Sequence, residues 1–93
     1  MRIVITGIGD IGRELAGMLN RREGNELILI DSDEKICEKL AAEIDGLVLH
    51  GDGTDPAILK KAGLAEADAL IATTPSDPIN TVIAMLGHRM GVE

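Results

Sequence analysis

Four short apolar segments alternate along the chain with longer stretches in which apolar residues recur every three or four positions. Apolar runs without polar alternation predict strands buried on both faces, and the spacing of three or four predicts amphipathic helices. Such an alternation favours right-handed crossovers and a parallel sheet with helices on both faces. The predicted strands are Arg2–Thr6, Glu26–Ile30, Leu47–His50 and Ala69–Ala72.

Capping residues mark the predicted helices as well as their periodicity does. Ser32 or Asp33 is suited to cap the second helix. Pro56, after Asp55, favours the first turn of the third helix, and Gly63 favours its end. The apolar faces expected to pack on the sheet are Ile11, Leu15, Met18 and Leu19; Ile36, Leu40 and Ile44; Ile58, Leu59 and Ala62; and, in a last helix that begins near Pro78, Ile79, Val82, Ile83, Leu86 and Met90.

Length and composition limit the chain to one domain with few kinds of partner. Its 93 residues suffice for a single domain, residues 1–93. With 16 acidic and 9 basic residues and no Phe, Trp or Tyr, nonspecific binding to nucleic acid or to an anionic membrane surface is not expected. One cysteine excludes a disulfide framework. No apolar run reaches the ~20 residues of a membrane span, so we expect a cytoplasmic domain without membrane insertion.

A sheet built in this order is expected to place the first strand between the second and the fourth. The strands then lie in the order 3-2-1-4, as in a Rossmann-like α/β fold. A complete dinucleotide-binding fold usually has about six strands, so the sequence corresponds to roughly its first two-thirds. No repeat, low-complexity segment or linker interrupts the chain. We therefore expect an α/β domain that is truncated relative to the full fold.

A glycine-rich segment, Gly7-Ile8-Gly9-Asp10-Ile11-Gly12, joins the first predicted strand to the first predicted helix. It matches the pattern G-x-G-x-x-G in the strand–turn–helix context that a phosphate loop requires. Gly7 would permit the tight turn, Gly9 would let the backbone approach a pyrophosphate, and Gly12 would let helix and strand pack closely. The N–H groups of the first helical turn would then face the phosphates. The alternative is a glycine-rich turn that binds nothing.

An acidic residue, Asp31, lies nineteen residues after Gly12, at the end of the second predicted strand. A carboxylate there can accept hydrogen bonds from the 2′- and 3′-hydroxyls of a ribose, and it repels a 2′-phosphate. The sequence therefore favours NAD(H) or an adenosine nucleotide over NADP(H), with Ser32 as a neighbouring candidate contact. The alternative is that Asp31 only caps the second helix, a role for which Asp33 is the better candidate.

Three further segments match a known family more specifically than the glycine loop does. Residues 48–59, VLHGDGTDPAIL, contain G-D-x-T-x-x-x-x-L. Residues 62–74, AGLAEADALIATT, resemble A-G-I-x-x-A-D-x-x-I-A-x-T, and residues 77–80, DPIN, resemble D-E-x-N. On these segments the chain resembles the TrkA N-terminal (RCK/KTN) family over essentially all of its length. The resemblance implies a cytosolic regulatory domain of a potassium channel or transporter that binds NAD(H), ATP, ADP or AMP and changes conformation.

The resemblance also implies roles for single residues. Asp52 would accept from the exocyclic amine of adenine, and Gly53 stands where many relatives have a small alanine-like residue, a change expected to matter little. Thr73 and Thr74 would lie near the pyrophosphate. Asn80 would stabilise the loop after the fourth strand or contact the distal part of the ligand. The plainer alternatives are a turn at Asp52 and a simple strand end at Thr73.

Two departures from the family pattern affect ligand and partner. Asp10 occupies a loop position that is basic or neutral in many relatives, and a carboxylate near phosphates is expected to cost ~0.5–1 kcal/mol of binding. The fifth strand, with an arginine that relatives often use at the nucleotide or subunit interface, has no counterpart. The edge 70–72 and parts of Val82, Ile83 and Leu86 would then be exposed, so we expect a homodimer through this edge and helix. The alternative is a monomer whose last helix folds back over the edge.

No residue pattern indicates catalysis. Cys37, His50 and His88 have no partner at the spacing of a metal site or a nucleophile–base pair, and Cys37 is expected to be a small buried residue. We therefore predict a non-catalytic regulatory domain whose partners are a membrane subunit of a potassium transport system and further copies of the chain. The alternative is the cofactor-binding half of an NAD-dependent oxidoreductase, which rests on fold analogy alone.

Overall fold

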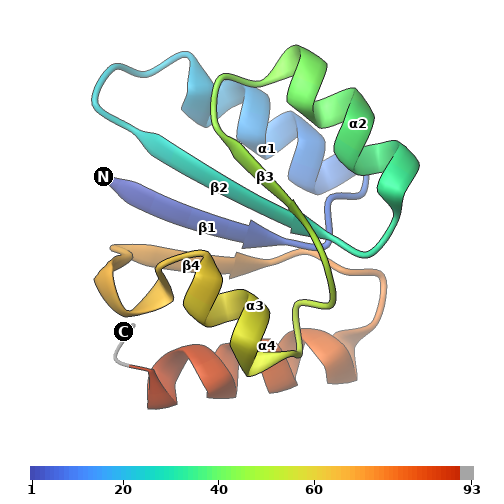
Figure 1. Ribbon diagram of the computed structural model, residues 1–93, viewed down its shortest axis with the longest axis vertical. Coiled ribbons are helices and arrows are strands. Elements are labelled where there is room, and N and C mark those ends of the chain that lie inside the picture. Colours follow the sequence, from blue (N-terminus) through green and yellow to red (C-terminus); the bar gives the residue numbers. More distant parts are fainter. Residues whose placement is uncertain (91–93) are drawn as a thin grey trace.

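The computed structural model describes residues 1–90 as a parallel sheet with helices on both faces (Figure 1). The elements are β1 (Arg2–Thr6), α1 (Asp10–Asn20), β2 (Glu26–Asp31), α2 (Glu34–Glu43), β3 (Leu47–His50), α3 (Pro56–Lys61), a 3₁₀ turn η1 (Leu64–Glu66), β4 (Ala69–Ala72) and α4 (Asp77–Arg89). The strand order is β3-β2-β1-β4, and every neighbouring pair is parallel. The predicted Rossmann-like α/β fold and its strand order are confirmed.

The register brings the carboxyl ends of the four strands to one edge of the sheet. Thr6, the last residue of β1, pairs with Ile30 of β2 on one side and with Ala72 of β4 on the other. Asp31, the last residue of β2, pairs with His50, the last residue of β3. The loops that follow these strands therefore begin side by side, where ligands bind in open α/β sheets.

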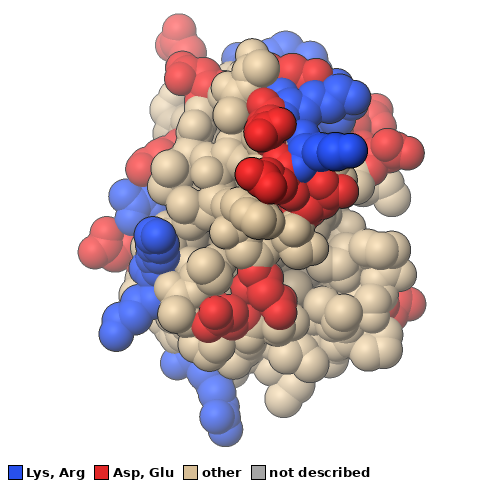
Figure 2. All heavy atoms as spheres, turned by 45° about the vertical axis from the view of Figure 1, so that its right-hand side comes forward, with Lys and Arg blue, Asp and Glu red and all other residues tan. Residues whose placement is uncertain are grey.

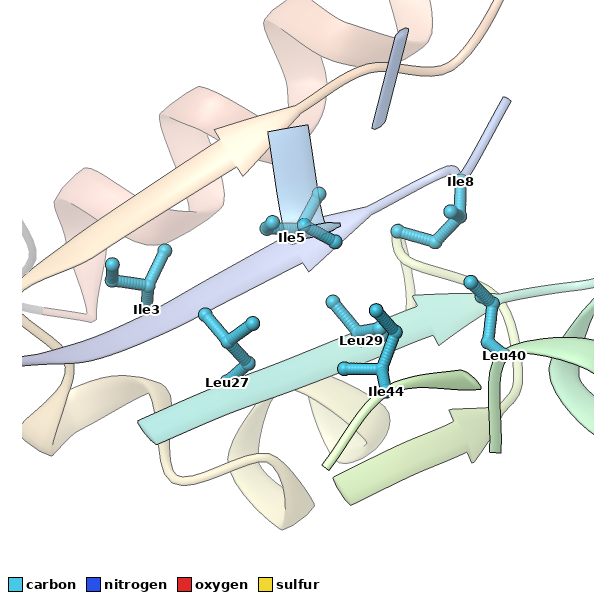
Figure 3. Packing of buried hydrophobic residues seen from close by; sticks show 8 residues of the cluster. Ile3, Ile5, Ile8, Leu27, Leu29, Leu40 and Ile44 are labelled. Carbon is cyan, nitrogen blue, oxygen red and sulfur yellow. The ribbon is translucent and has the colours of Figure 1, made fainter. Parts of the chain in front are cut away.

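Side chains that alternate along the strands form one core on each face of the sheet. Ile3, Ile5, Leu27 and Leu29 form one core with Ala16 of α1 and Leu40 of α2. Figure 3 shows how the strand residues of this core pack against Leu40 and Ile44. The opposite core contains Val4, Ile28 and Ile30 of the sheet with Leu59, Ala62 and Leu64 from α3 and the turn after it. The uninterrupted apolar runs in the sequence are explained by this two-sided burial.

Helix α1 packs on the sheet through two small residues, Gly12 and Ala16. A Cβ atom at Gly12 would lie 2.6 Å from Thr73 Oγ1, so only a glycine allows this close approach. The helix is thereby turned so that Ile11 and Met18 lie outside the core, with 75% and 52% of their surfaces exposed. The prediction that these two residues pack on the sheet was wrong.

Helix α4 begins after the N-cap Ser76, whose hydroxyl accepts from the N–H of Ile79. It packs on β4 at Gly87, where a Cβ atom would lie 2.4 Å from Leu70 Cδ2. Ile83 on the same side is fully buried, whereas Val82 is 45% exposed and Leu86 is half-buried. Part of Ile83 was expected to be exposed, and this was wrong, because the close approach turns Ile83 inward; its place on the packing face of the helix is confirmed. The exposed apolar residues of α4 are Ile79, Val82 and Met85.

The predicted boundaries hold to within a few residues. Asp33 caps α2, with its side chain accepting from the N–H groups of Lys35 and Ile36, and Asp55 caps α3. Strand β2 extends one residue beyond its predicted end to include Asp31. The turn η1 was not predicted.

Within residues 1–90, none of the helices combines the length and apolar character needed to span a membrane.

Candidate functional site

A cavity of about 210 Å³ opens at the carboxyl edge of the sheet, beside the point where the chain order reverses between β1 and β4. Crevices at such switch points are the usual ligand sites of open α/β sheets. The cavity draws residues from the ends of β1 and β2 and from the loops after β3 and β4. Its lining consists of Thr6, Gly7, Ile30, Asp31, Ser32, Gly51, Asp52, Gly53, Thr74, Pro75, Ser76, Ile79 and Ile83.

The first glycine of the loop, Gly7, is hydrogen-bonded to β2 and packs against the β4–α4 loop. Gly7 has a φ angle of +74°, and its N–H donates to Ile30 O over 2.8 Å. A Cβ atom at Gly7 would lie 2.3 Å from Thr74 Cγ2 and 2.8 Å from two backbone atoms of Thr74. Both the left-handed conformation and the contact with the β4–α4 loop therefore require glycine at this position.

Gly9 differs from the other two glycines of the motif. It is the N-cap of α1, with φ −82°, and its carbonyl accepts from the N–H of Arg13. Apart from its two chain neighbours, no residue that the structure describes has an atom within 4 Å of a Cβ built on Gly9. Nothing in the described part of the chain therefore requires glycine here, and the open space leaves room for a group outside the protein. The sequence motif predicts a phosphate group in this space.

The carboxylate of Asp31 is buried and holds the loops around it. One oxygen accepts from the N–H of Ile8 over 2.7 Å, and the other accepts from the N–H of Asp33 over 2.8 Å. The residue is 9% exposed. Because each carboxylate oxygen can accept more than one hydrogen bond, both retain capacity for a ribose hydroxyl. The N-cap of α2 is Asp33, so the alternative role of Asp31 as the cap does not apply.

The loop after β2 is also held from β3. The His50 ring nitrogen Nε2 lies 3.0 Å from the carbonyl oxygen of Ser32. Sequence analysis gave His50 no role, because the contact depends on the β2–β3 register that places His50 opposite Asp31. Ser32 itself is exposed at the mouth of the cavity.

Asp52 forms a compact turn at the start of the β3–α3 loop. One of its carboxylate oxygens accepts from the N–H of Thr54 over 2.8 Å and from the Thr54 hydroxyl over 2.7 Å. These two hydrogen bonds lower the pKa of Asp52. The carboxylate lies on the cavity wall and has a second oxygen for which the structure gives no hydrogen bond. The turn-forming role and a ligand contact are therefore compatible.

Gly53 is more constrained than the sequence suggested. A Cβ atom there would lie 3.1 Å from Thr6 Cβ and 3.4 Å from Ile83 Cδ1. An alanine would force one of these buried neighbours to move. The shift needed is a few tenths of an ångström, and the expectation that glycine in place of a small side chain matters little stays a prediction.

The β4–α4 loop is bound to the glycine loop through two threonines and an asparagine. The Thr73 hydroxyl donates to Gly7 O over 2.7 Å. The amide of Asn80 accepts from the Thr74 N–H and donates to the Thr74 carbonyl oxygen, each over 3.0 Å. Asn80 thus stabilises the loop after β4, one of its two expected roles, and its two backbone bonds leave Thr74 at the cavity wall.

Asp10 and Ile11 lie away from this cavity. Asp10 is exposed in the first turn of α1 and lines a second cavity, of about 200 Å³, together with Gly9, Arg13 and Lys39. Ile11 projects into solvent. Of the predicted binding residues, Gly7, Asp31, Ser32, Asp52, Gly53 and Thr74 line the first cavity, Gly9 and Asp10 line the second, and Ile11, Gly12, Thr73 and Asn80 line neither.

Charge on this side of the molecule is mostly negative around the strand ends. Figure 2 brings the carboxyl edge of the sheet forward and shows acidic side chains on two sides of a largely uncharged central area. Basic side chains gather above that area. A phosphate bound at the glycine loop would face the backbone N–H groups at the start of α1, and Arg13 and Lys39 line the same cavity as Gly9.

The residues examined as metal ligands or nucleophiles in the sequence are isolated or buried in the described part of the chain. No cluster of three His, Cys, Asp or Glu residues suited to a metal ion occurs among residues 1–90. Cys37 is buried, as predicted, and burial, followed by the charge of Asp31, raises the pKa of its thiol. A protonated, buried thiol is a poor nucleophile.

One known protein family matches both the strands and helices of this chain and the loops that form the candidate site. The model of the TrkA-N domain family matches residues 3–92. The chain belongs to the TrkA-N domain family. The match includes the glycine loop, Asp31 and all three segments that pointed to the family in the sequence.

Relatives of this TrkA-N domain include potassium uptake proteins. It is 37% identical over 92 residues to the Trk system potassium uptake protein TrkA homolog of Methanothermobacter thermautotrophicus, covering 99% of this chain and 42% of that protein. It is 36% identical over 90 residues to TrkA of Haemophilus influenzae, covering 97% of this chain and 19% of that protein. The TrkA-N domain thus spans less than half the length of these relatives.

A solved structure has the same fold. The Shewanella denitrificans Kef CTD in its AMP-bound form aligns with a TM-score of 0.79 at 23% identity, covering 96% of this chain and 52% of that one. This likeness supports the Rossmann-like arrangement of the TrkA-N domain described above.

Proposed function

We propose that this domain binds an adenine nucleotide at the carboxyl edge of its sheet and regulates a potassium transport system. The observation that carries the proposal is the Asp31 carboxylate, held against the N–H of Ile8 in the glycine loop and next to the cavity. The family membership, the potassium uptake proteins among the relatives and the AMP-bound Kef CTD support it.

Different residues of the site would contact different parts of the nucleotide. We propose that Gly9 and the first N–H groups of α1 face the phosphates, that Asp31 binds the ribose hydroxyls, and that Asp52 accepts from the adenine amine. Thr74 and Ser32 lie at the cavity wall as further contacts. The ligands that fit these groups are NAD(H), ATP, ADP and AMP, with NAD(H) as our first expectation.

Ligand choice provides a direct test. A buried carboxylate at the ribose position should repel a 2′-phosphate, so we expect NAD(H), AMP, ADP and ATP to bind at least about tenfold more tightly than NADP(H). Isothermal titration calorimetry on one preparation, at one salt concentration, measures all of these affinities. NADPH binding as tight as that of NADH would remove the basis for assigning Asp31 to the ribose.

Regulation would act through the link between the glycine loop and α4. The bonds from Thr73 to Gly7 and from Asn80 to Thr74 connect the proposed phosphate site to the start of α4. A nucleotide that binds one arrangement of these loops better than another shifts their populations. The proposed receivers are a membrane subunit of a potassium channel or transporter, reached from the cytoplasmic side, and further copies of this chain. The exposed stripe Ile79, Val82 and Met85 is the apolar part of α4 available for such contacts.

The alternative of an oxidoreductase cofactor domain remains less well supported. It would share the glycine loop and Asp31 but would need groups for hydride chemistry. The described residues hold no cluster of His, Cys, Asp or Glu suited to a metal ion.

A further inference from the structure

One polar side chain at the floor of the site has no partner. Thr6, the last residue of β1, is fully buried, and its Oγ1 is the single buried side-chain nitrogen or oxygen atom within residues 1–90 that lacks a hydrogen bond. Its backbone is satisfied, because its carbonyl oxygen accepts from the N–H of Thr73 over 2.9 Å. The deficit therefore belongs to the hydroxyl alone.

The position of Thr6 connects this deficit to the cavity. Thr6 lines the cavity beside Gly7 and Asp31, below the β3–α3 loop at Gly53. The loop comes so close that a Cβ atom at Gly53 would lie 3.1 Å from Thr6 Cβ. Valine has the same shape as threonine and would fill the site without an unpaired hydroxyl, which costs free energy when buried. A buried polar group without a partner calls for an explanation such as a ligand or a bound water.

We infer that the Thr6 hydroxyl acquires its hydrogen-bond partner when an adenine nucleotide enters the cavity, so that Thr6 is a ligand-binding residue of this site. The inference rests on the proposed function. It adds a residue that neither the sequence motifs nor the resemblance to the family singled out. Because the hydroxyl can donate as well as accept, it is suited to the polar atoms of a ribose or an adenine or to a water bound with them.

Two pairs of variants isolate the hydroxyl. Thr6→Val differs from the wild type only by exchange of hydroxyl for methyl, and Thr6→Ala differs from Thr6→Ser only by the hydroxyl. We expect Thr6→Val to bind AMP and NAD(H) about 3- to 10-fold more weakly than the wild type, and Thr6→Ala more weakly than Thr6→Ser by a similar factor. Without ligand, the melting temperature of Thr6→Val should equal or exceed that of the wild type. Thr81→Val is the control, since the Thr81 hydroxyl donates to Asp77 O on exposed α4; it should bind as the wild type does.

Affinities measured by calorimetry, and melting curves recorded without ligand, test the role of the Thr6 hydroxyl in these proteins. Less than threefold loss of affinity in both pairs would overturn the inference. So would a lower melting temperature of ligand-free Thr6→Val, because the hydroxyl would then have a partner before the nucleotide arrives. If the wild type binds no adenine nucleotide, both the proposed function and this inference fail. Normal binding by Thr6→Val would refute only the role of Thr6 as a ligand-binding residue.

Discussion

Asp31→Asn is expected to lower the free energy of unfolding by about 2–4 kcal/mol and to remove most of the nucleotide affinity. Both oxygens of the carboxylate accept backbone N–H groups, from Ile8 and from Asp33, in a residue that is 9% exposed. An asparagine keeps one acceptor and turns an NH₂ group toward the other N–H. One buried donor, the N–H of Ile8 or of Asp33, then loses its partner; if it is that of Ile8, the bond from Gly7 N–H to Ile30 O is left to hold the glycine loop to β2.

Asp33→Asn is the matched control for this change. It removes a charge two residues away, but asparagine is as good an N-cap as aspartate, so α2 keeps its cap and little stability is lost. Denaturant unfolding followed by circular dichroism gives both free energies, and calorimetry with AMP gives the affinities. Equal, small losses in the two variants would contradict the role given to the Asp31 carboxylate.

Gly7→Ala is expected to destabilise the fold by about 2–5 kcal/mol, the sum of a left-handed backbone and an overlap with its neighbours. Its φ angle is +74°, and the added Cβ would lie 2.3 Å from Thr74 Cγ2. Gly24→Ala separates the two terms, because Gly24 has φ +87° with no atom within 4 Å of an added Cβ. We expect Gly24→Ala to lose only about 1–2 kcal/mol.

The measurement is the difference between these two alanine variants in denaturant unfolding. An excess loss at position 7 reports the contact between the glycine loop and the β4–α4 loop. Equal losses would mean that Thr74 does not press on Gly7, and the proposed connection from the phosphate loop to α4 would lose its support.

The fold was predictable because its signals are local. The run Ile3–Ile5 and the run Leu27–Ile30 are apolar on both faces, and each ends close to a glycine or an acid. Asp33, Asp55 and Gly63 have the chemistry of helix ends.

The pattern of apolar residues does not predict where two elements pack unusually closely, or how a helix is turned as a result. Val82 and Ile83 are equally apolar, and the contact of Gly87 with Leu70 decides that Ile83 faces the sheet. Ile11 is excluded from the core in the same way by the approach of Gly12 to Thr73. Small residues set these orientations, and a count of apolar positions does not detect them.

The sequence predicted which residues lie at the candidate site, but not the hydrogen bonds between them. The motif placed Gly7 and Asp31 correctly at the carboxyl edge of the sheet. That Asp31 binds the glycine loop, that His50 contacts Ser32, and that the Thr6 hydroxyl is unpaired all depend on the register of β1, β2 and β3. Homodimer formation stays a prediction, and Ile83, which was expected to contribute to its interface, belongs to the core.

Gly9→Ala tests the central claim, that the glycine loop and Asp31 form a nucleotide site, most directly. Apart from its chain neighbours, no described residue has an atom within 4 Å of the added Cβ, and φ is −82°, so the fold should lose no more than the small preference for glycine over alanine at an N-cap. Gly17→Ala, also in open space, adds the same methyl group farther along α1. We predict that Gly9→Ala melts within a few degrees of the wild type yet binds AMP and NAD(H) at least about tenfold more weakly in calorimetry, while Gly17→Ala binds normally. Wild-type affinity in Gly9→Ala would contradict a phosphate at this loop.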